Sequence, residues 1–219
     1  MTSAIIVAAG SSRRMGFDKL LADLAGKPVL AHSIAAFEAC DDIAEILIIT
    51  SEERFPIIRK LEAEHGFRKI THIIPGGAQR HDSVWAGLQK VDPAAELIAV
   101  HDGARPLITP TQITRCIRSA QQHRAATSAH PITDTVKRAN AQHQVTEAVD
   151  RENLWAMETP QVFDSQLLIE SYKKIIAAGE LVTDEVSALE VPVHLVANDS
   201  PNPKITFPAD LETAAKLLG

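Results

Sequence analysis

The stretch SAIIVAAGSSRRMGFDK, residues 3–19, begins with a short apolar run and continues into a loop of small residues, two arginines and a lysine. An apolar run of this length, bounded by turn residues, is typical of a buried β-strand. Gly10 and Gly16 permit close approach to the backbone of the loop, whose exposed amides can meet phosphate oxygens. Arg14 and Lys19 can add charged hydrogen bonds to the same anion. The stretch therefore predicts a first strand followed by a phosphate-binding loop, and a solvated loop with incidental cations is the alternative.

The alternation of short apolar runs with longer helical patterns decides the fold class. Runs of strand length lie at Ala4–Ala9, Ile46–Thr50, Ile70–Ile74, Leu97–His101 and Ala125–His130. Helical spacing fills the intervals, at Val29–Ala39, Phe55–Glu64, Gln79–Val91 and Gln112–His123. Such alternation indicates βαβ units and a parallel sheet. We expect a Rossmann-like, three-layer α/β fold with a mainly parallel, twisted sheet.

The pattern changes after Pro131. Thr135–Arg138 and Val145–Val149 are short β-prone pieces around a polar segment, which predicts a hairpin that protrudes from the sheet. Further elements are predicted as helices at Asp164–Ala177 and Asp184–Leu189, strands at His194–Ala197 and Lys204–Thr206, and a final helix at Ala209–Leu218. We expect one domain over residues 1–219, with a β-arm inserted at about residues 132–153.

The composition bounds the class of partner. The chain has 219 residues, 45% of them hydrophobic, and a formal net charge of −6. Recognition of a phosphate backbone normally needs a basic excess, so we expect no general nucleic-acid binding, and any anion site must come from a few converging cations. Since no apolar run approaches the roughly 18–20 residues of a membrane span and no signal peptide is evident, we expect no membrane partner and a cytoplasmic location. Cys40 and Cys116 lack motif spacing and are expected to be buried and reduced.

Distinctive residues gather directly after the predicted strands, where ligands bind in an open parallel sheet. The segments AAGSSRRMG, PGGAQRHDS, HDGARP and PITDT follow the first, third, fourth and fifth strands. The first of these loops lacks Gly-x-Gly-x-x-Gly and also lacks the Gly-Lys-Ser/Thr ending of a P-loop. NAD-dependent hydride transfer and ordinary ATPase chemistry therefore lose support.

Asp102 follows the fourth strand directly and is the candidate metal ligand. Magnesium prefers oxygen ligands and keeps water and substrate phosphates in its shell, so one protein carboxylate is enough when a triphosphate supplies the rest. We expect His101 to be a hydrogen-bonded structural residue, and Arg105 to brace its loop through backbone carbonyls rather than contact an anion. Asp82 or Ser83 is expected to cap the helix after the third strand.

The segment TDEVSALE, residues 183–190, contains two adjacent carboxylates. They could suggest a metal pair, but we interpret Asp184 and Glu185 as the start of a helix that Thr183 caps, where negative charge is favourable. Both carboxylates therefore stay outside the predicted site.

These segments together resemble a known family of enzymes. The first loop is similar to the small-small-Gly, Arg-Met-Gly, Lys opening of the nucleotidyltransferase superfamily. The later blocks resemble the cytidylyltransferases that act on 2-C-methyl-D-erythritol 4-phosphate, in PGGAQRHDSVWAGL (75–88), VDRENLWAMETPQVF (149–163), TDEVSALE (183–190) and NPKITFPADL (202–211), where Pro203 replaces the family's common isoleucine. The resemblance implies transfer of CMP from CTP to 2-C-methyl-D-erythritol 4-phosphate, giving 4-CDP-2-C-methyl-D-erythritol and pyrophosphate, with Mg²⁺ or another divalent cation.

The resemblance also implies a role for each motif residue. The nucleotide would contact Ala8, Ala9, Gly10, Gly16, Gly76, Gly77, Asp82 and Ser83. The charge-stabilising residues would be Arg14, Lys19 and Lys204, with Asp102 on the metal and Asp199 in the place of an occasional second carboxylate. The acceptor would contact Thr135, Arg151 and Thr159. The family's arm crosses to a second subunit, so the resemblance implies a homodimer in which Arg151 completes the partner's site.

Two other functions stay open. A ribitol 5-phosphate cytidylyltransferase shares the fold and most of the motifs, and differs on the acceptor side, at residues such as Arg151 and Thr159. A nucleotide-binding regulatory module could keep the fold without catalysis. The whole set of charged residues argues against that module, because a protein that only binds its nucleotide does not need it.

Overall fold

The computed structural model describes residues 1–10, 12 and 15–219 of the chain. The strands are β1 (Thr2–Ala8), β2 (Asp23–Leu24), β3 (Lys27–Pro28), β4 (Ile43–Thr50), β5 (Ile70–Pro75), β6 (Leu97–Asp102), β7 (Ala125–Pro131), β8 (Val136–Ala139), β9 (Val145–Val149), β10 (Trp155–Asp164) and β11 (His194–Ala197). The helices are α1 (Val29–Glu38), α2 (Phe55–His65), α3 (Arg80–Leu88), α4 (Pro110–His123), α5 (Ser165–Ala178) and α6 (Pro208–Leu218), with short 3₁₀ helices η1 (Glu52–Arg54) and η2 (Val186–Ala188).

The sheet confirms the predicted mainly parallel α/β fold. Within the described residues, seven strands form one sheet in the order β11-β7-β10-β6-β1-β4-β5. The pairs β1–β4, β1–β6, β4–β5 and β7–β11 are parallel, and β10 runs antiparallel to both β6 and β7. Because β1 lies between β4 and β6, its carboxyl end delivers the first loop to the middle of the sheet edge.

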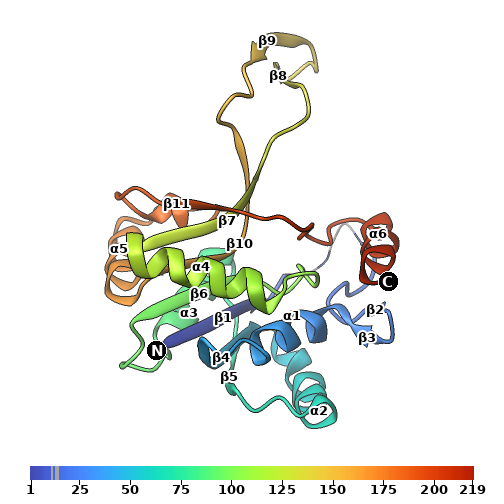
Figure 1. The fold of residues 1–219 in the computed structure, drawn as a ribbon, viewed down its shortest axis with the longest axis vertical. Coiled ribbons are helices and arrows are strands. Elements are labelled where there is room, and N and C mark those ends of the chain that lie inside the picture. Colours follow the sequence, from blue (N-terminus) through green and yellow to red (C-terminus); the bar gives the residue numbers. More distant parts are fainter. Residues whose placement is uncertain (11, 13–14) are drawn as a thin grey trace.

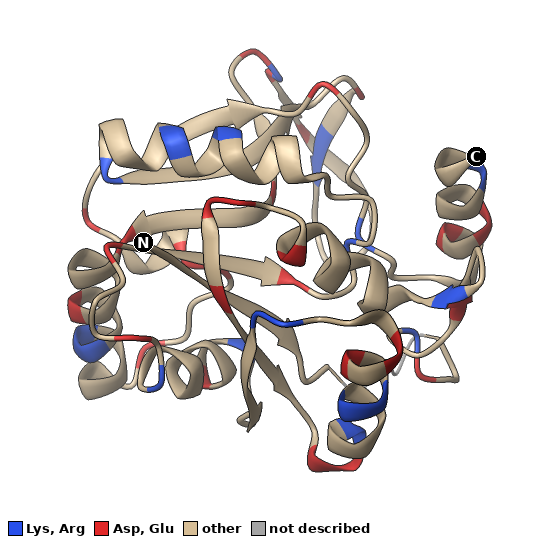
Figure 2. Cartoon of the chain, turned by 60° about the horizontal axis from the view of Figure 1, so that its bottom comes forward, with Lys and Arg blue, Asp and Glu red and all other residues tan. Residues whose placement is uncertain are grey.

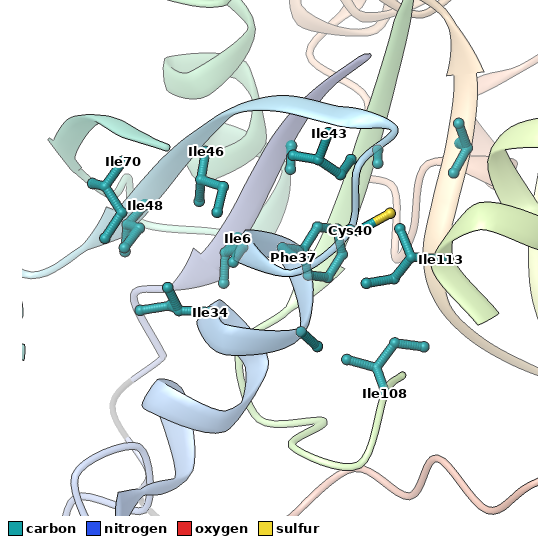
Figure 3. Packing of buried hydrophobic residues seen from close by; sticks show 14 of the residues in the cluster. Ile6, Ile34, Phe37, Cys40, Ile43, Ile46, Ile48, Ile70, Ile108 and Ile113 are labelled. Carbon is teal, nitrogen blue, oxygen red and sulfur yellow. The ribbon is translucent and has the colours of Figure 1, made fainter. Parts of the chain in front are cut away.

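Helices cover both faces of this sheet, which accounts for the apolar character of β1 on both of its sides. Ile6 packs in the cluster that α1 and α4 cover, together with Phe37 and Ile113 (Figure 3). Ile5, the neighbour of Ile6, points the opposite way into the cluster that α3 and α5 cover. Burial of each such large side chain contributes about 1.5–3 kcal/mol. None of the described helices is both long and apolar enough to cross a membrane.

The two cysteines lie on one side of the sheet. Cys40 and Cys116 are both free and buried in the α1–α4 cluster (Figure 3 labels Cys40), as the sequence predicts. Burial raises the pKa of the Cys116 thiol to about 12. Both residues therefore belong to the core rather than to a reactive or metal-binding site.

The predicted hairpin is present as β8 and β9, which pair antiparallel to each other. Figure 1 shows this hairpin standing well away from the main sheet. One connecting segment leads out from β7 to the hairpin, and a second leads back from it into β10. Most of its side chains are exposed. The arm is therefore placed where only its base meets the body of the same chain.

Two predictions about the second half of the chain need correction, and one strand there was not predicted. The segment Trp155–Asp164 is a sheet strand, although Glu158 and Pro160 are residue types depleted in strands; the register shifts between Met157 and Gln161, where the proline is accommodated. The helix predicted at Asp184–Leu189 is only the turn η2. Lys204–Thr206 is not a strand, because the neighbouring prolines cannot donate backbone hydrogen bonds.

Candidate active site

A cavity of about 640 Å³ opens at the carboxyl ends of β1 and β6. Its described lining includes the first loop, the start of α3, the end of β6 and the segment before α6: Val7, Ala8, Ala9, Gly10, Ser12, Met15, Lys19, Leu20, Gly77, Ala78, Gln79, Arg80, Ser83, Asp102, Ala104, Lys204 and Thr206. Most of the predicted nucleotide-binding residues are on this list. The position agrees with the rule that parallel sheets bind ligands beyond the carboxyl ends of their strands.

The glycine pair after β5 packs tightly against the first loop, through Gly76, and against α3, through Gly77. A Cβ atom on Gly76 would lie 2.3 Å from the Cβ atom of Ala9, and one on Gly77 would lie 2.2 Å from that of Asp82. Neither distance is possible between real side chains. The Gly77 amide donates to Ser83 Oγ at 3.1 Å. The two glycines are therefore required because the backbone passes within contact distance of the first loop and of α3.

Helix α3 points its N-terminus into the cavity, and its N-cap lies before the predicted cap residues. Gln79 occupies the N-cap position, and the Asp82 carboxylate accepts the Gln79 N–H at 3.0 Å. The prediction that Asp82 or Ser83 caps the helix is therefore wrong; Asp82 supports the cap from three residues along, as in a capping box. Asp82 is not among the described lining residues, whereas Ser83 is. The partial positive charge of the helix N-terminus favours an anion at this wall.

Asp102 lies at the end of β6 between two cations. Lys204 Nζ donates to Asp102 Oδ2 at 2.6 Å, and Arg80 Nε donates to Oδ1 at 3.1 Å. Burial alone would raise the pKa of Asp102, but Arg80 and Lys204 together hold that pKa well below its ordinary value. The carboxylate therefore stays ionised at any pH near neutrality.

Arg80 lines the pocket but is not among the site residues that the sequence predicts. Its guanidinium donates to both oxygens of Glu185, at 2.6 and 3.1 Å, and Tyr172 Oη donates to Glu185 Oε1 at 2.9 Å. Burial by itself lowers the pKa of Arg80, but Glu185 and Asp102 keep it above its ordinary value. Glu185 is fully buried at the N-cap of η2, and its two carboxylate oxygens accept hydrogen bonds from Arg80 and Tyr172. It is the counter-charge that fixes Arg80 beside Asp102.

A chain of hydrogen bonds lies beneath Asp102. The Asp102 N–H donates to Thr159 Oγ1 at 3.1 Å, and Thr159 Oγ1 lies 3.0 Å from His101 Nδ1. His101 Nε2 lies 3.3 Å from the Arg105 carbonyl oxygen, which can only accept, so Nε2 carries the proton and Nδ1 accepts from Thr159. Burial lowers the pKa of His101 to about 3. His101 is thus a neutral structural residue, as predicted.

Arg105 braces its loop in the predicted way. Its guanidinium donates to the backbone carbonyls of Asn202 and Met157, at 2.7 and 3.3 Å. The first contact attaches the loop after β6 to the segment that carries Lys204. Burial lowers the pKa of Arg105 below its ordinary value.

The two lysines reach the cavity from opposite ends of the chain. Lys19 Nζ donates to the Ile205 carbonyl oxygen at 2.6 Å, next in sequence to Lys204. The Ile205 N–H in turn donates to the Ala104 carbonyl oxygen at 2.8 Å, so one short segment brings both lysines to the loop after β6. Gly16 adopts a positive φ of 73° on the way to Lys19. Arg14, the predicted partner of Lys19, lies outside the described residues.

Other predicted residues lie away from the cavity. Thr135 and Arg151 are exposed residues at the arm, and a guanidinium nitrogen of Arg151 donates to the Thr133 carbonyl oxygen. Thr159 is buried under Asp102 rather than among the described lining residues. Asp199 pairs with Arg115 at 2.8 Å on an exposed surface. One chain alone does not gather the predicted acceptor residues around this cavity.

The charge of the pocket is opposite to that of the chain. Among the described lining residues, Lys19, Arg80 and Lys204 are positive and Asp102 is negative, in a chain with a formal net charge of −6. Figure 2 shows acidic and basic residues interspersed over the helices and loops rather than gathered into a basic face. A few converging side chains therefore give the pocket its positive charge in a chain that is acidic as a whole.

The pocket fits a metal that brings most of its own ligands. The described part of the chain holds no cluster of three or more His, Cys, Asp or Glu residues that could bind a metal ion. Each oxygen of Asp102 accepts one of the two side-chain hydrogen bonds described above, and a carboxylate oxygen has a second acceptor position. Asp102 can thus supply one ionised oxygen ligand to a cation held mainly by substrate phosphates.

Comparison with known proteins identifies the family. The family model of 2-C-methyl-D-erythritol 4-phosphate cytidylyltransferase matches residues 2–219. The chain belongs to the 2-C-methyl-D-erythritol 4-phosphate cytidylyltransferase family. A relative of that name from Caldanaerobacter subterraneus subsp. tengcongensis is 40% identical over 99% of this chain and 98% of its own. Another cytidylyltransferase of the same name, from Symbiobacterium thermophilum, is 39% identical over 99% of this chain and 92% of its own.

Solved structures of the cytidylyltransferase family have the same fold. The 4-diphosphocytidyl-2C-methyl-D-erythritol synthase of Anaerococcus prevotii superposes with a TM-score of 0.88 at 28% identity, over 100% of this chain and 96% of that one. The 2-C-methyl-D-erythritol 4-phosphate cytidylyltransferase of Thermus thermophilus gives a TM-score of 0.81 at 27% identity, over 98% and 97%. Family membership confirms the resemblance seen in the sequence, and makes the chain a nucleotidyltransferase enzyme.

Proposed function

We propose that the chain transfers CMP from CTP to 2-C-methyl-D-erythritol 4-phosphate in the described cavity, giving 4-CDP-2-C-methyl-D-erythritol and pyrophosphate for isoprenoid synthesis. One observation carries the assignment of the reaction to this cavity: Lys19, Arg80 and Lys204 converge around Asp102 beside a small-residue loop, in an otherwise acidic chain. Such a site suits a triphosphate, because three cations and a helix N-terminus face the same space.

The nucleotide lies between the two loops that contact each other through Gly76 and Ala9. On this proposal the base and ribose lie by Gly76, Gly77 and Ser83, with Asp82 behind them. The triphosphate follows the first loop toward Lys19 and Lys204, along Ala8, Ala9, Gly10 and Gly16. Arg14 is a further cation that contacts the triphosphate. Small residues allow the phosphates to approach the backbone amides.

The acceptor's phosphate oxygen attacks the α-phosphorus of CTP, and the bond from that phosphorus to the bridging oxygen of pyrophosphate breaks. A phosphate monoester with a second pKa near 6 is already largely anionic at pH 7, so no general base is needed. This agrees with the neutral, buried state of His101. Asp102 would hold a divalent cation together with the triphosphate, and that cation would supply positive charge where negative charge develops.

Lys19 and Lys204 supply the fixed positive charge for this step. Preorganised charges of this kind lower a barrier because they need no rearrangement as the reaction proceeds. Arg80 adds positive charge at the same place, and Glu185 fixes its guanidinium through a hydrogen bond of 2.6 Å. The Thr159 hydroxyl accepts a hydrogen bond from the Asp102 N–H. On this proposal Thr159 therefore orients the Asp102 carboxylate.

The acceptor side involves a second subunit. Thr135 and Arg151 are exposed at an arm that stands away from its own cavity (Figure 1). An isolated two-stranded hairpin is at best marginally stable in water, so packing against another chain accounts for an arm of this shape. We place Thr135 and Arg151 at the partner's acceptor site in a homodimer. We treat residues 1–219 as one cytoplasmic nucleotidyltransferase domain with the arm inserted at about residues 132–153.

The test is pyrophosphate release from the intact protein with CTP and Mg²⁺. Separate reactions contain 2-C-methyl-D-erythritol 4-phosphate, ribitol 5-phosphate or no acceptor, and parallel reactions replace CTP by UTP or add a chelator. We expect release with CTP and the methylerythritol acceptor, and none after chelation. Preference for ribitol 5-phosphate would assign the alternative acceptor, and CTP binding without release in any reaction would leave only a nucleotide-binding module.

A further inference from the structure

Arg54 is a buried arginine whose three guanidinium nitrogens all bond to the segment that forms the first loop. It lies in η1, directly after β4, and is 8% exposed. Its NH1 donates to the Ala8 carbonyl oxygen at 2.9 Å, NH2 to the Gly10 carbonyl oxygen at 3.2 Å, and Nε to Asp18 Oδ2 at 2.6 Å. The predicted site in the sequence does not include it. Burial of this charge is costly unless the guanidinium is fully bonded, so the arrangement calls for an explanation.

The two carbonyl contacts fix the start of the loop. In a trans peptide the C=O group and the following N–H point in opposite directions. The Ala8 oxygen is held by Arg54 and also by Thr50 Oγ1, at 3.1 Å, so the Ala9 N–H is turned the other way. Ala8, Ala9 and Gly10 line the cavity, and Arg54 is not among the described lining residues. Arg54 therefore holds this part of the loop from behind.

The third contact fixes the end of the loop. Asp18 uses Oδ2 for Arg54 and Oδ1 to accept the Leu20 N–H, at 3.1 Å. Lys19 lies between these two anchored residues, and its side chain reaches into the cavity. The same guanidinium thus ties residues 8–10 to Asp18, and through Asp18 it fixes the backbone from which Lys19 projects.

We propose that Arg54 is a positioning residue for nucleotidyl transfer. Its planar guanidinium fixes the two ends of the first loop relative to each other. As a result, the Ala9 amide and the Lys19 ammonium both face the triphosphate. The role depends on the fixed fork of an arginine, because a lysine ammonium is a single point that cannot meet three separated acceptors in this geometry. This inference rests on the proposed function, since it assigns the loop to the triphosphate.

The test compares Arg54→Lys, which keeps the charge and removes the fork, with wild type. Arg59→Lys is the matched control, because it makes the same change on an exposed side chain of α2 that pairs with Glu62. The readouts are kcat and KM for CTP, the equilibrium affinity for CTP, and the urea midpoint. We expect Arg54→Lys to lower kcat by about 10–100-fold, as for a small misplacement of reacting groups, with a smaller change in CTP affinity. Arg59→Lys should match wild type.

A second variant and a second measurement keep the inference testable if Arg54→Lys folds poorly. Asp18→Asn removes the charged contact and leaves the two carbonyl contacts, so it should show the same kinetic split with a smaller loss of kcat. Hydrogen exchange should be faster in Arg54→Lys at the Leu20 amide, which donates to Asp18, and unchanged in β4.

Four outcomes separate the possibilities. A lower urea midpoint with kcat and KM within about twofold of wild type would make Arg54 merely structural, since a misplaced loop costs far more in rate. A raised KM with unchanged kcat would overturn positioning in favour of uniform binding. If wild type itself releases no pyrophosphate, the proposed function fails, whereas unchanged exchange at the Leu20 amide overturns the role of Arg54 on its own.

Discussion

Replacement of Glu185 by glutamine should destabilise the fold strongly, because it leaves Arg80 without its main counter-charge. Glu185 is fully buried and accepts both Arg80 nitrogens, at 2.6 and 3.1 Å, as well as the Tyr172 hydroxyl at 2.9 Å. Removal of one partner of a buried ion pair typically costs about 3–5 kcal/mol. The Arg80 side chain is 24% exposed, so water can relieve part of the loss, and we expect about 3 kcal/mol.

A loss of this size is readily measured. It is a large fraction of the roughly 5–15 kcal/mol by which folded domains are stable, and in a chain of this length it lowers Tm by about 6–12 °C. Urea unfolding should show a lower midpoint with an unchanged m-value, because the surface exposed on unfolding stays the same.

A double-mutant cycle tests whether the ion pair is the cause. Arg80→Met alone leaves Glu185 charged and buried with only Tyr172 bonded to its carboxylate, so it should also be destabilising. The double variant Arg80→Met/Glu185→Gln removes both charges and should be more stable than the sum of the single losses predicts, by about 1–3 kcal/mol. Losses that add to within about 0.5 kcal/mol would refute the reasoning, because two independent sites behave in that way.

Three further predictions follow from the site. The pKa of His101 is about 3 in the folded chain, against an ordinary value of 6.5. Between these two values the unfolded chain binds a proton on His101 and the folded chain does not. Wild-type stability should therefore fall as the pH drops from 6.5 towards 3, by up to about 1.4 kcal/mol per pH unit. Urea midpoints over that range should be less pH-dependent in His101→Gln, and equal slopes would contradict the burial argument. Lys19→Ala and Lys204→Ala should each reduce kcat by about 10²–10³-fold and change CTP affinity far less. Lys174→Ala, which alters an exposed lysine, is the control and should behave as wild type. Normal turnover in either pocket variant removes that residue from the mechanism. When Lys19→Ala and Arg151→Ala proteins are combined in equal amounts, about a quarter of wild-type activity should be recovered. Half of the dimers then contain one subunit of each variant, and each such dimer has one intact site. No recovery would place Arg151 in its own subunit's site.

The sequence was sufficient for the parts of the fold that follow local patterns. Alternating apolar runs and helical stretches predict β1 and its parallel neighbours, because strands buried on both faces are continuously apolar. The strand Trp155–Asp164 could not be found in this way. Its middle contains Glu158, Pro160 and Gln161, which are buried in the structure and are paired by contacts that only the folded chain reveals, such as His130 Nδ1 with Glu158 at 2.6 Å.

The same division holds in the candidate site. Asp102 and Lys204 lie in recognisable segments after strands, and the structure brings them to 2.6 Å. The pairing of Arg80 with Glu185 joins residues 105 positions apart, and no periodicity encodes a contact at that separation. The two carboxylates at 184 and 185 look like a helix start because local rules favour acids there. Asp184 does accept the Ser187 N–H, at 3.0 Å, whereas the Glu185 carboxylate is buried against Arg80. Thr159 lies in a motif, but the direction of its hydroxyl depends on the packing of β10 against β6.

The contact between Gly76 and Ala9 makes the first loop and the loop before α3 a single unit for sequence change. A larger residue at either position would force the two backbones apart, since even a Cβ atom on Gly76 would lie 2.3 Å from that of Ala9. Exchange of one of these loops for that of a relative should therefore succeed only when the other loop is exchanged with it. Attempts to redesign the preferred nucleotide base have to treat residues 8–10 and 76–83 as one cassette, even though more than sixty positions separate them in the chain.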